Sequence, residues 1–222
     1  MDRSADSGAA PGDARDSALS RYRRRRDFAR TAEPDGSTGD GGREGGPLFV
    51  VQRHIARSEH YDLRLEVDGV LKSWAVPKGP STDPDDKRLA VPTEDHPLDY
   101  AGFEGTIPAD DYGGGTVLVW DTGTYANTTG RSMAEGLAHG HVSFELNGEK
   151  LTGRFALHRF RPGGADEQGQ WLLVKEHDSA AGSGSGPVST RPESVRTGRG
   201  IGEVADEEGR TVEGRPRDGD RR

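Results

Sequence analysis

Three ionisable side chains occupy alternate positions of one short segment: His60, Asp62 and Arg64. The residues between them are apolar, and successive side chains of an extended strand point to opposite faces. The three would therefore share one face, with the apolar residues on the other. An imidazole, a carboxylate and a guanidinium side by side can hold a metal ion and an anion together. The less specific interpretation is a solvated charge pair with a stray histidine.

A second histidine, His54, lies six residues before His60 and can join this face only if the chain between them loops back. A lone histidine at such a position is more often structural. If it does join, two imidazoles and one carboxylate form an N,N,O set suited to Mn²⁺ or Zn²⁺, with open positions for water or substrate. Cysteine is absent, which excludes a thiolate zinc site, a disulfide scaffold and a cysteine nucleophile.

Local positive charge is available for a phosphate. The chain has a net charge of -8, so no global field attracts nucleic acid and any phosphate binding has to be local. Arg64, Lys78 and Arg88 would supply enough positive charge. Strand alternation puts Glu94 and His96 in phase with Arg88 if that run stays extended. The less specific interpretations are that Lys78 is an ordinary loop residue and that His96 belongs to a turn.

The element that carries the three-residue face is predicted to be a hairpin. Asp68-Gly69 separates two alternating runs, 60–67 and 70–76, and both turn residues tolerate positive φ. A two-residue turn then places Ser73 opposite Arg64, so a hydroxyl flanks the ionisable face.

The rest of the body also alternates in short runs separated by Gly, Pro and Asp. We expect further strands at 48–52, 89–91, 116–121, 142–146, 150–155 and 171–175, and a short helix near 132–138. Short strands with frequent turns favour a mainly β fold. We predict a compact β-barrel with one or two short helices and disordered tails.

The polar and apolar parts of the chain separate. Every histidine and lysine lies between Pro47 and His177, and only 30% of all residues are hydrophobic. We expect a disordered tail over 1–17, an N-terminal arm over 18–46 with a short basic helix at 17–30, a barrel body over 47–177, and a disordered Gly/Ser/Arg-rich tail over 179–222. No run approaches the roughly 18 apolar residues of a membrane span, so we expect a cytoplasmic, nucleoid-associated protein without membrane contact.

Several blocks resemble, in order, the 3'-phosphoesterase domain of bacterial DNA ligase D and together span roughly residues 18–178. They are Phe49–His54, His60–Glu66, Leu71–Pro80, Lys87–Val91, Glu94–Tyr100, Phe103–Pro108 and Trp171–Lys175, preceded by Leu19, Tyr22, Arg26–Phe28 and Glu33-Pro34. The resemblance implies an Mn²⁺-dependent enzyme, with Co²⁺ or Zn²⁺ as alternatives, that heals DNA 3' ends during non-homologous end joining. Enzymes of this family remove a 3'-terminal ribonucleoside and then the 3'-phosphate, leaving a 3'-hydroxyl.

The resemblance also implies roles for individual residues. The metal ligands would be His54, His60 and Asp62, and the scissile phosphate would contact Arg64, Lys78, Arg88 and His96, with Ser73 and Tyr100 beside it. Positions tied to the nuclease step match Arg26, Asp27, Glu33 and Glu94. We further expect His96 to act as general acid on the departing oxygen.

The expected substrate is a DNA primer-template or duplex 3' end carrying a terminal ribonucleotide or a 3'-phosphate. No sequence remains for polymerase or ligase domains, so we expect a stand-alone, monomeric phosphoesterase, with a ligase, polymerase or Ku-like protein acting in trans. Two alternatives stay open. One is a non-catalytic DNA-end-binding barrel that recruits repair partners, and the other is a small-molecule metalloenzyme of the cupin kind.

Overall fold

The chain forms an antiparallel β-barrel, seen in a computed structural model that describes residues 11–37, 45–163, 169–184 and 186–216. The strands are β1 (Leu48–Ile55), β2 (Glu59–Val67), β3 (Val70–Val76), β4 (Lys87–Pro92), β5 (Gly105–Ile107), β6 (Gly115–Asn127), β7 (His141–Gly148), β8 (Thr152–Arg161) and β9 (Gln170–Lys175). They are ordered β1-β2-β3-β4-β9-β8-β7-β6, and β6 pairs back with β1 to close the barrel, while β5 extends the sheet beyond β6. The predicted fold class, a mainly β compact barrel, is confirmed.

The described residues also form short helices. They are α1 (Pro11–Arg24), α2 (Met133–His139), α3 (Pro187–Thr190), α4 (Ile201–Glu207) and the 3₁₀ turn η1 (Leu98–Gly102). The predicted helix near 132–138 is α2, which begins after a capping box in which Ser132 and Glu135 satisfy each other's backbone amides. Among the described residues, no helix is long and apolar enough to cross a bilayer.

The first hairpin has the predicted register. Arg64 lies opposite Ser73 and Asp62 opposite Ala75, across a turn in which Asp68 adopts a φ of 52°. The other predicted strands are present with shifted ends. β8, for example, begins at Thr152 rather than at residue 150, because the Asp121 carboxylate accepts hydrogen bonds from the amides of residues 149–151 and holds them in a turn.

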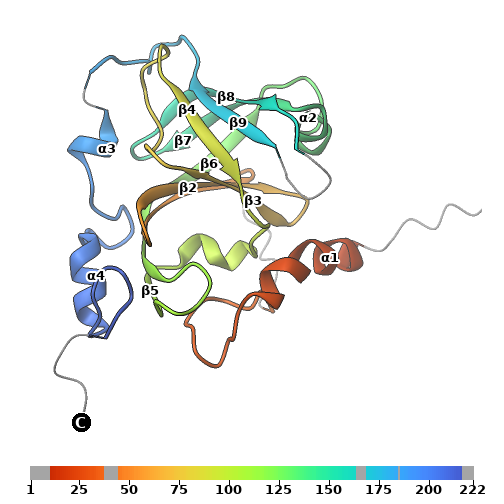
Figure 1. Ribbon diagram of the computed structural model, residues 1–222. Helices are drawn as coiled ribbons and strands as arrows, with labels where there is room; N and C mark the ends of the chain where they lie inside the picture. The colour runs from red at the N-terminus through yellow and green to blue at the C-terminus, as the bar shows by residue number, and fades with distance from the viewer. Residues whose placement is uncertain (1–10, 38–44, 164–168, 185, 217–222) are drawn as a thin grey trace, which may run out of the picture.

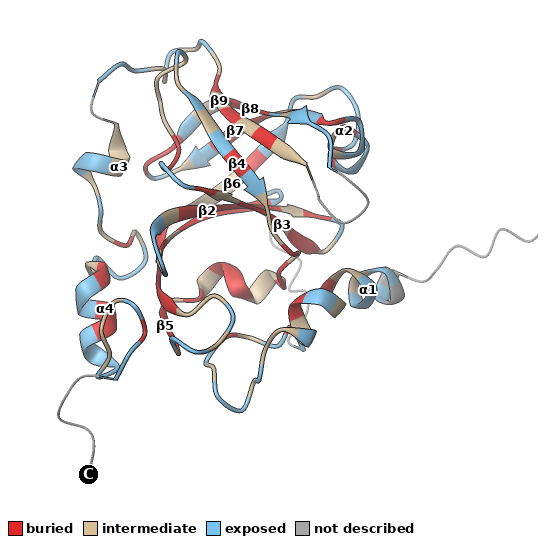
Figure 2. Ribbon diagram, viewed as in Figure 1, coloured by how far each residue is buried: buried red, intermediate tan, exposed pale blue. Residues whose placement is uncertain are grey.

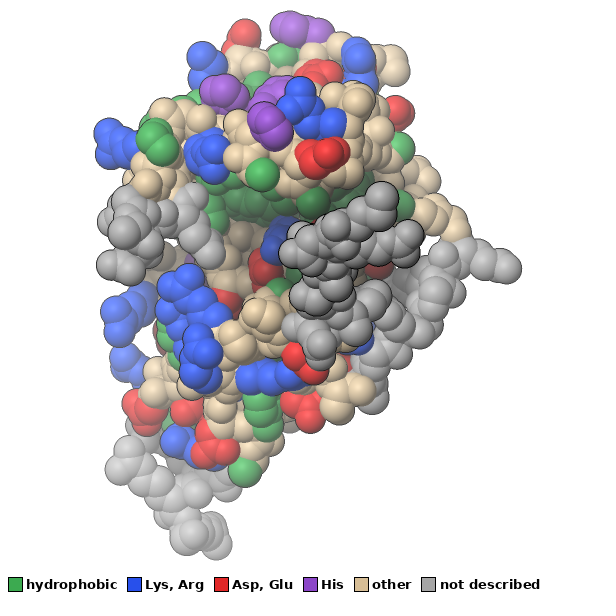
Figure 3. All heavy atoms as spheres, turned by 90° about the vertical axis from the view of Figure 1, so that its right-hand side faces the viewer, with side chains coloured by type: hydrophobic (Ala, Val, Ile, Leu, Met, Phe, Trp, Pro, Cys, Tyr) green, Lys and Arg blue, Asp and Glu red, His purple; other side chains and the backbone are tan. Residues whose placement is uncertain are grey.

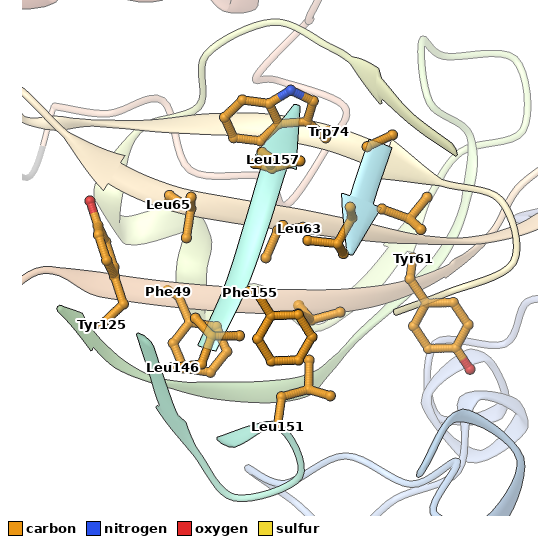
Figure 4. Close-up of a cluster of buried hydrophobic side chains, with 14 of the residues drawn as sticks. Phe49, Tyr61, Leu63, Leu65, Trp74, Tyr125, Leu146, Leu151, Phe155 and Leu157 are labelled. Atoms are coloured by element: carbon orange, nitrogen blue, oxygen red, sulfur yellow. The ribbon is translucent and has the colours of Figure 1, made fainter. Parts of the chain in front are cut away.

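One face of every strand except β5 fills the barrel with apolar side chains. Phe49, Leu63, Trp74, Trp120 and Phe155 belong to this core cluster and are almost fully buried. Figure 4 shows part of the cluster, with side chains from several strands pointing toward one another. The interior of the barrel is therefore an apolar core, and chemistry has to take place on the outside.

A second layer covers the outer wall made by β1, β2 and β3. η1 and the arm that follows α1 lie against this wall, below β2 in the view of Figure 1. Val50 and Leu71 of the wall form a second apolar cluster with Tyr22 of α1 and with Tyr100 and Phe103 at η1. Consecutive residues of this wall are accordingly buried, and β2 and β3 are drawn largely in red in Figure 2. The ionisable face of the hairpin is thus enclosed between the wall and the second layer.

The prediction of a disordered tail over 1–17 is wrong for its described part. The helix begins at Pro11 and ends at Arg24, several residues earlier than predicted at both ends, and residues 1–10 lie outside the described part of the chain. A tight turn follows the helix, since the amides of Arg30 and Thr31 donate to the Asp27 carbonyl at 2.9 and 3.2 Å.

The prediction of a disordered tail over 179–222 is also wrong for the residues that the structure describes. Ile201 and Val204 of α4 are buried in the core cluster, and the Val195 amide donates to the Val119 carbonyl of β6 at 3.0 Å. Composition showed that this segment cannot bury enough apolar surface alone. It packs here because the barrel supplies the missing surface and hydrogen-bond partners.

Candidate active site

The pairing of β1 with β2 brings the two predicted imidazoles together. β1 and β2 are antiparallel with His54 opposite His60, so the chain between them loops back as the prediction required. Asp62 lies two residues further along β2, on the same face. Its Oδ2 is 3.7 Å from His54 Nδ1 and 3.8 Å from His60 Nε2. These separations are too long for hydrogen bonds and leave room for one ion between the three groups.

The donor set fits a divalent metal. Among the described residues, His54, His60 and Asp62 form a group whose ligand atoms all lie within 4.8 Å of one another. His60 Nδ1 lies 3.1 Å from the Ser58 carbonyl, an arrangement that directs Nε2 toward the cluster. His54 Nε2 is buried without a hydrogen-bond partner in the described part of the chain, an orphan that a ligand could satisfy.

Asp62 is ionised in this environment. Burial by itself would raise the pKa of this carboxyl, but Arg64, which lies 3.2 Å away, and the two imidazoles outweigh burial and hold the pKa below its usual range. An ionised carboxylate beside two imidazoles is suited to Mn²⁺ or Zn²⁺.

Arg64 connects this metal cluster to the rest of the site. Its side chain is buried and donates to Gln52 Oε1 at 2.8 Å and to Ser73 Oγ at 2.9 Å, while Nη1 also lies 2.9 Å from His96 Nδ1. Gln52 in turn donates to the carbonyls of Tyr100 and Phe103, each at 3.0 Å. Gln52 was not among the predicted site residues, although an amide in phase with His54 within an apolar strand is a usable signal.

His96 is brought to Arg64 by backbone pairing with β3. The amides of Leu71 and His96 each donate to the other's carbonyl, at 2.8 and 3.0 Å. The ring packs edge-on against Tyr22 and Tyr100, with centroids 5.0 and 4.7 Å apart. Burial first, and then the cations Arg64 and Arg26, lower the pKa of His96 well below 6.5.

Arg26 of the arm covers the site on the side opposite the wall. Its Nε donates to Glu33 Oε1 and its Nη1 to Glu94 Oε1, both at 2.8 Å. Tyr100 also donates to Glu33 Oε1, at 3.0 Å. Burial lowers the pKa of Arg26, but Glu33, Tyr100 and Glu94 raise it by a larger amount. The net pKa therefore lies above its usual value. Three of the four predicted nuclease-step residues thus form one buried network.

The fourth residue of that prediction, Asp27, lies apart from the network. It is exposed, and its carboxylate accepts from the Ala29 amide at 3.1 Å within the turn after α1. The neighbouring arginines are also engaged. Arg23 pairs with Asp16 at 3.0 Å, and Arg25 pairs with Glu94. Most arginines of the run 23–26 therefore form ion pairs within the protein.

A cavity of about 470 Å³ opens over these groups. Of the predicted site residues, it is lined by Arg26, His54, His60, Asp62, Arg64, Glu94, His96 and Tyr100. Loop residues that the sequence analysis did not single out also line it, among them Arg57, Asp111 and Tyr112. Ser73 and Glu33 lie behind the lining and contact it through hydrogen bonds.

Lys78 and Arg88 are not brought into this cavity. Lys78 is exposed after the end of β3. Val91 pairs with Ala75 and so shares the face of Asp62, whereas Ala90 is buried in the barrel core. The prediction that Arg88 is in phase with Glu94 and His96 required the run to stay extended, but β4 ends at Pro92. Arg88 instead shares the core-facing side of β4 with Ala90, so the prediction is wrong, and its Nη2 pairs with Asp86 at 2.7 Å.

A cluster of potential metal ligands beside a buried arginine is the kind of site that phosphoester hydrolases use. Residues 52–159 match the model of the DNA ligase D 3'-phosphoesterase domain. These residues belong to that family.

Curated relatives cover more of the chain. A multifunctional non-homologous end joining protein LigD of Pseudomonas aeruginosa is 50% identical over 183 residues, which is 82% of this chain and 21% of the relative. A LigD of Mycobacterium tuberculosis is 48% identical over 145 residues, 64% of this chain and 18% of the relative. The chain therefore spans about a fifth of the length of these curated relatives.

Proposed function

We propose that this protein processes DNA 3' ends in non-homologous end joining as a metal-dependent phosphoesterase. It would remove a 3'-terminal ribonucleoside and then the 3'-phosphate, leaving a 3'-hydroxyl. The observation that carries the proposal is one cavity that contains the His54, His60 and Asp62 cluster together with Arg64 and His96. The family match and the names of the LigD relatives support the substrate class. We propose action in the cytoplasm at the nucleoid, with a ligase, polymerase or Ku-like partner acting in trans.

His54, His60 and Asp62 would hold Mn²⁺, or Co²⁺ or Zn²⁺ in its place. When bound, a divalent ion supplies positive charge to the phosphate oxygens and lowers the cost of charge development. Arg64 neutralises a second part of that charge from its fixed position between Gln52 and Ser73.

His96 is the group placed to move a proton. It lies against Arg64, and its Nε2 is 3.4 Å from Arg26 Nη2. A bound phosphate brings negative charge beside the ring and raises its pKa, so His96 can be protonated in the complex and donate to the departing oxygen. Tyr100 stays un-ionised, because burial and the nearby Glu33 raise its pKa well above 10.0.

Arg26, Glu33 and Glu94 would orient the ribonucleoside that leaves in the nuclease step, since they close the cavity from the arm. The predicted phosphate contacts of Lys78 and Arg88 stay predictions. Neither residue lines the cavity, so such contacts would require DNA that extends beyond it.

The decisive experiment uses a 5'-labelled primer-template that ends in a single ribonucleotide. We expect Mn²⁺-dependent shortening of the primer, followed by loss of the 3'-phosphate. Asp62→Asn should abolish both steps, and His141→Asn is the matched control because His141 is exposed on β7, far along the chain from the site. Binding of the primer without shortening in Mn²⁺, Co²⁺ and Zn²⁺ would reject catalysis in favour of an end-binding module.

A further inference from the structure

A second, smaller cavity of about 270 Å³ adjoins the first on the side of α1. Thr93 and Glu94 line both cavities and form the divide between them. The Thr93 amide donates to the Ser73 carbonyl at 2.9 Å, which fixes this divide to β3. Figure 3, which views the side of the molecule that carries α1, shows a hollow between the barrel and the layer below it.

Two buried polar atoms at this second cavity have no hydrogen-bond partner in the described part of the chain. They are Trp74 Nε1 and Thr93 Oγ1, and both residues line the cavity. Trp74 is 4% exposed, and its indole nitrogen, which can only donate, points away from the apolar cluster in Figure 4. Buried donors are almost always satisfied. The two atoms therefore indicate a ligand with hydrogen-bond acceptors.

The charges around the cavity favour an anionic ligand. The two acidic groups that line it are neutralised: Asp95 pairs with Lys72 at 2.6 Å, and Glu94 pairs with arginines of the arm. Arg21 of α1 also lines the cavity and is exposed, without an ion pair to any described residue. Trp171 and Leu137 are apolar members of the same lining. A lining that combines basic with apolar and aromatic residues is typical of a single-stranded nucleic-acid subsite.

The geometry points to this cavity as the subsite for the nucleotide immediately 5' to the scissile phosphate, on the strand that the enzyme retains. This inference rests on the proposed function. The departing ribonucleoside is uncharged, whereas the retained strand carries a phosphate at every nucleotide, so the cavity with Arg21 and the free donors fits the retained strand. Its volume is just below the roughly 300–1,000 Å³ of drug-sized pockets, which is the scale of one nucleotide unit.

The test compares two probes on the full chain. One is a fluorescent trinucleotide with a 3'-phosphate, and the other is a deoxynucleoside 3'-phosphate used as competitor, both in EDTA so that no turnover occurs. Arg21→Gln should weaken the trinucleotide about tenfold, the size of one lost charged hydrogen bond. It should also reduce the slope of log affinity against log salt by about 0.7. Affinity for the deoxynucleoside 3'-phosphate should not change, because this probe fills the cavity but lacks the phosphate on the 5' side of that nucleotide, which is the group that Arg21 would contact.

The matched control is Arg24→Gln, an exposed arginine on the same helix that lines neither cavity. Trp74→Phe is the second variant, because it keeps an aromatic ring in the core and removes the indole donor. It should weaken the trinucleotide severalfold, with the circular dichroism spectrum unchanged.

Equal weakening of both probes by Arg21→Gln would locate the effect in the first cavity and overturn the inference. So would an equal effect of Arg24→Gln, or no effect of Arg21→Gln. Failure of the proposed function looks different: the wild-type chain would bind the trinucleotide with the Arg21 dependence described and yet hydrolyse no 3' end in any metal.

Discussion

Arg64 Nη1 lies 2.9 Å from His96 Nδ1, so a permanent cation is packed against an imidazole with no water between them. A second cation, Arg26, approaches the other ring nitrogen at 3.4 Å. Burial and these two cations lower the pKa of His96 well below 6.5, against the smaller opposing effects of Asp62 and the Glu94 carbonyl. His96 is therefore neutral in the free protein at neutral pH. Both stability and catalysis should depend on this.

The first prediction concerns stability against pH. The unfolded state takes up the His96 proton below pH 6.5 but the folded state does not, so the stability associated with the neutral ring is complete above pH 6.5 and decreases as pH falls. The decrease is at most about 1.4 kcal/mol per pH unit. His96→Gln should flatten the fall in Tm between about pH 6.5 and pH 5. His141→Gln is the control, and an unchanged pH slope in His96→Gln would show that other groups cause the fall.

The second prediction concerns the pH dependence of the diesterase step. If His96 donates a proton, activity declines as pH rises through its pKa. That pKa should be higher in kcat, which reports the enzyme-substrate complex, than in kcat/KM, which reports the free enzyme. A diester substrate is needed because its phosphate does not titrate near neutral pH. Coincident alkaline limbs for the two parameters would contradict the general-acid role.

The third prediction concerns the metal cluster. His60→Ala and Asp62→Ala should each weaken Mn²⁺ binding more than about 100-fold in calorimetry, because even changes behind the ligands cost roughly 10–100-fold. His139→Ala provides a matched loss of an exposed imidazole. If both site variants bind Mn²⁺ as the wild type does, the proposed ligand set is incorrect.

The fourth prediction separates charge from geometry at Arg64. Arg64→Lys keeps the charge beside Asp62 but loses the planar fork that contacts Gln52 and Ser73, so it should fold and yet lose about 10²-fold in kcat. Arg64→Ala leaves a buried carboxylate without its main cation and should cost about 3–5 kcal/mol of stability. The two are compared by urea unfolding and by turnover of a 3'-phosphorylated primer. A fully active Arg64→Lys would show that only the charge is needed.

Much of the site was predictable from the sequence because the first hairpin is specified locally. Asp68-Gly69 fixes the turn, and period-two alternation fixes which side chains share a face, so Arg64 and Ser73 meet as predicted. The error at Arg88 came from the same rule. Alternation predicts which residues of a strand share a face, but it does not predict which face points into the core. Ala90 is buried in the core, so the face that carries Arg88 and Ala90 is the core face.

The arm network was not derivable from local pattern. Arg26 and Glu94 are 68 residues apart in sequence, and nothing in either segment specifies that they pair. The enclosure of the ionisable face by a second layer follows from tertiary packing of Tyr22, Tyr100 and Phe103 on the wall. A strip that alternation alone would leave in solvent is therefore buried.

The last prediction concerns the C-terminal segment, which composition predicts to be disordered. This segment holds the chain between η1 and β5: Glu104 accepts hydrogen bonds from Thr197 Oγ1 at 2.8 Å and from Arg199 Nη2 at 3.1 Å, and also from Ser194. η1 carries Tyr100, so the contacts reach the wall of the active-site cavity.

Deleting residues 186–222 should therefore lower both Tm and activity. Point variants separate the loss of stability from the loss of activity. Val204→Ala, at a side chain that is 1% exposed, should cost about 1–3 kcal/mol and lower Tm by about 2–4 °C per kcal/mol with little change in kcat. Glu104→Gln should instead reduce kcat more than Tm, because it releases the η1 connection, and Glu145→Gln on the exposed face of β7 serves as its control. A truncated chain with wild-type Tm and turnover would show that the segment only rests on the barrel, since loss of its buried contacts and of the Glu104 hydrogen bonds would then have no consequence.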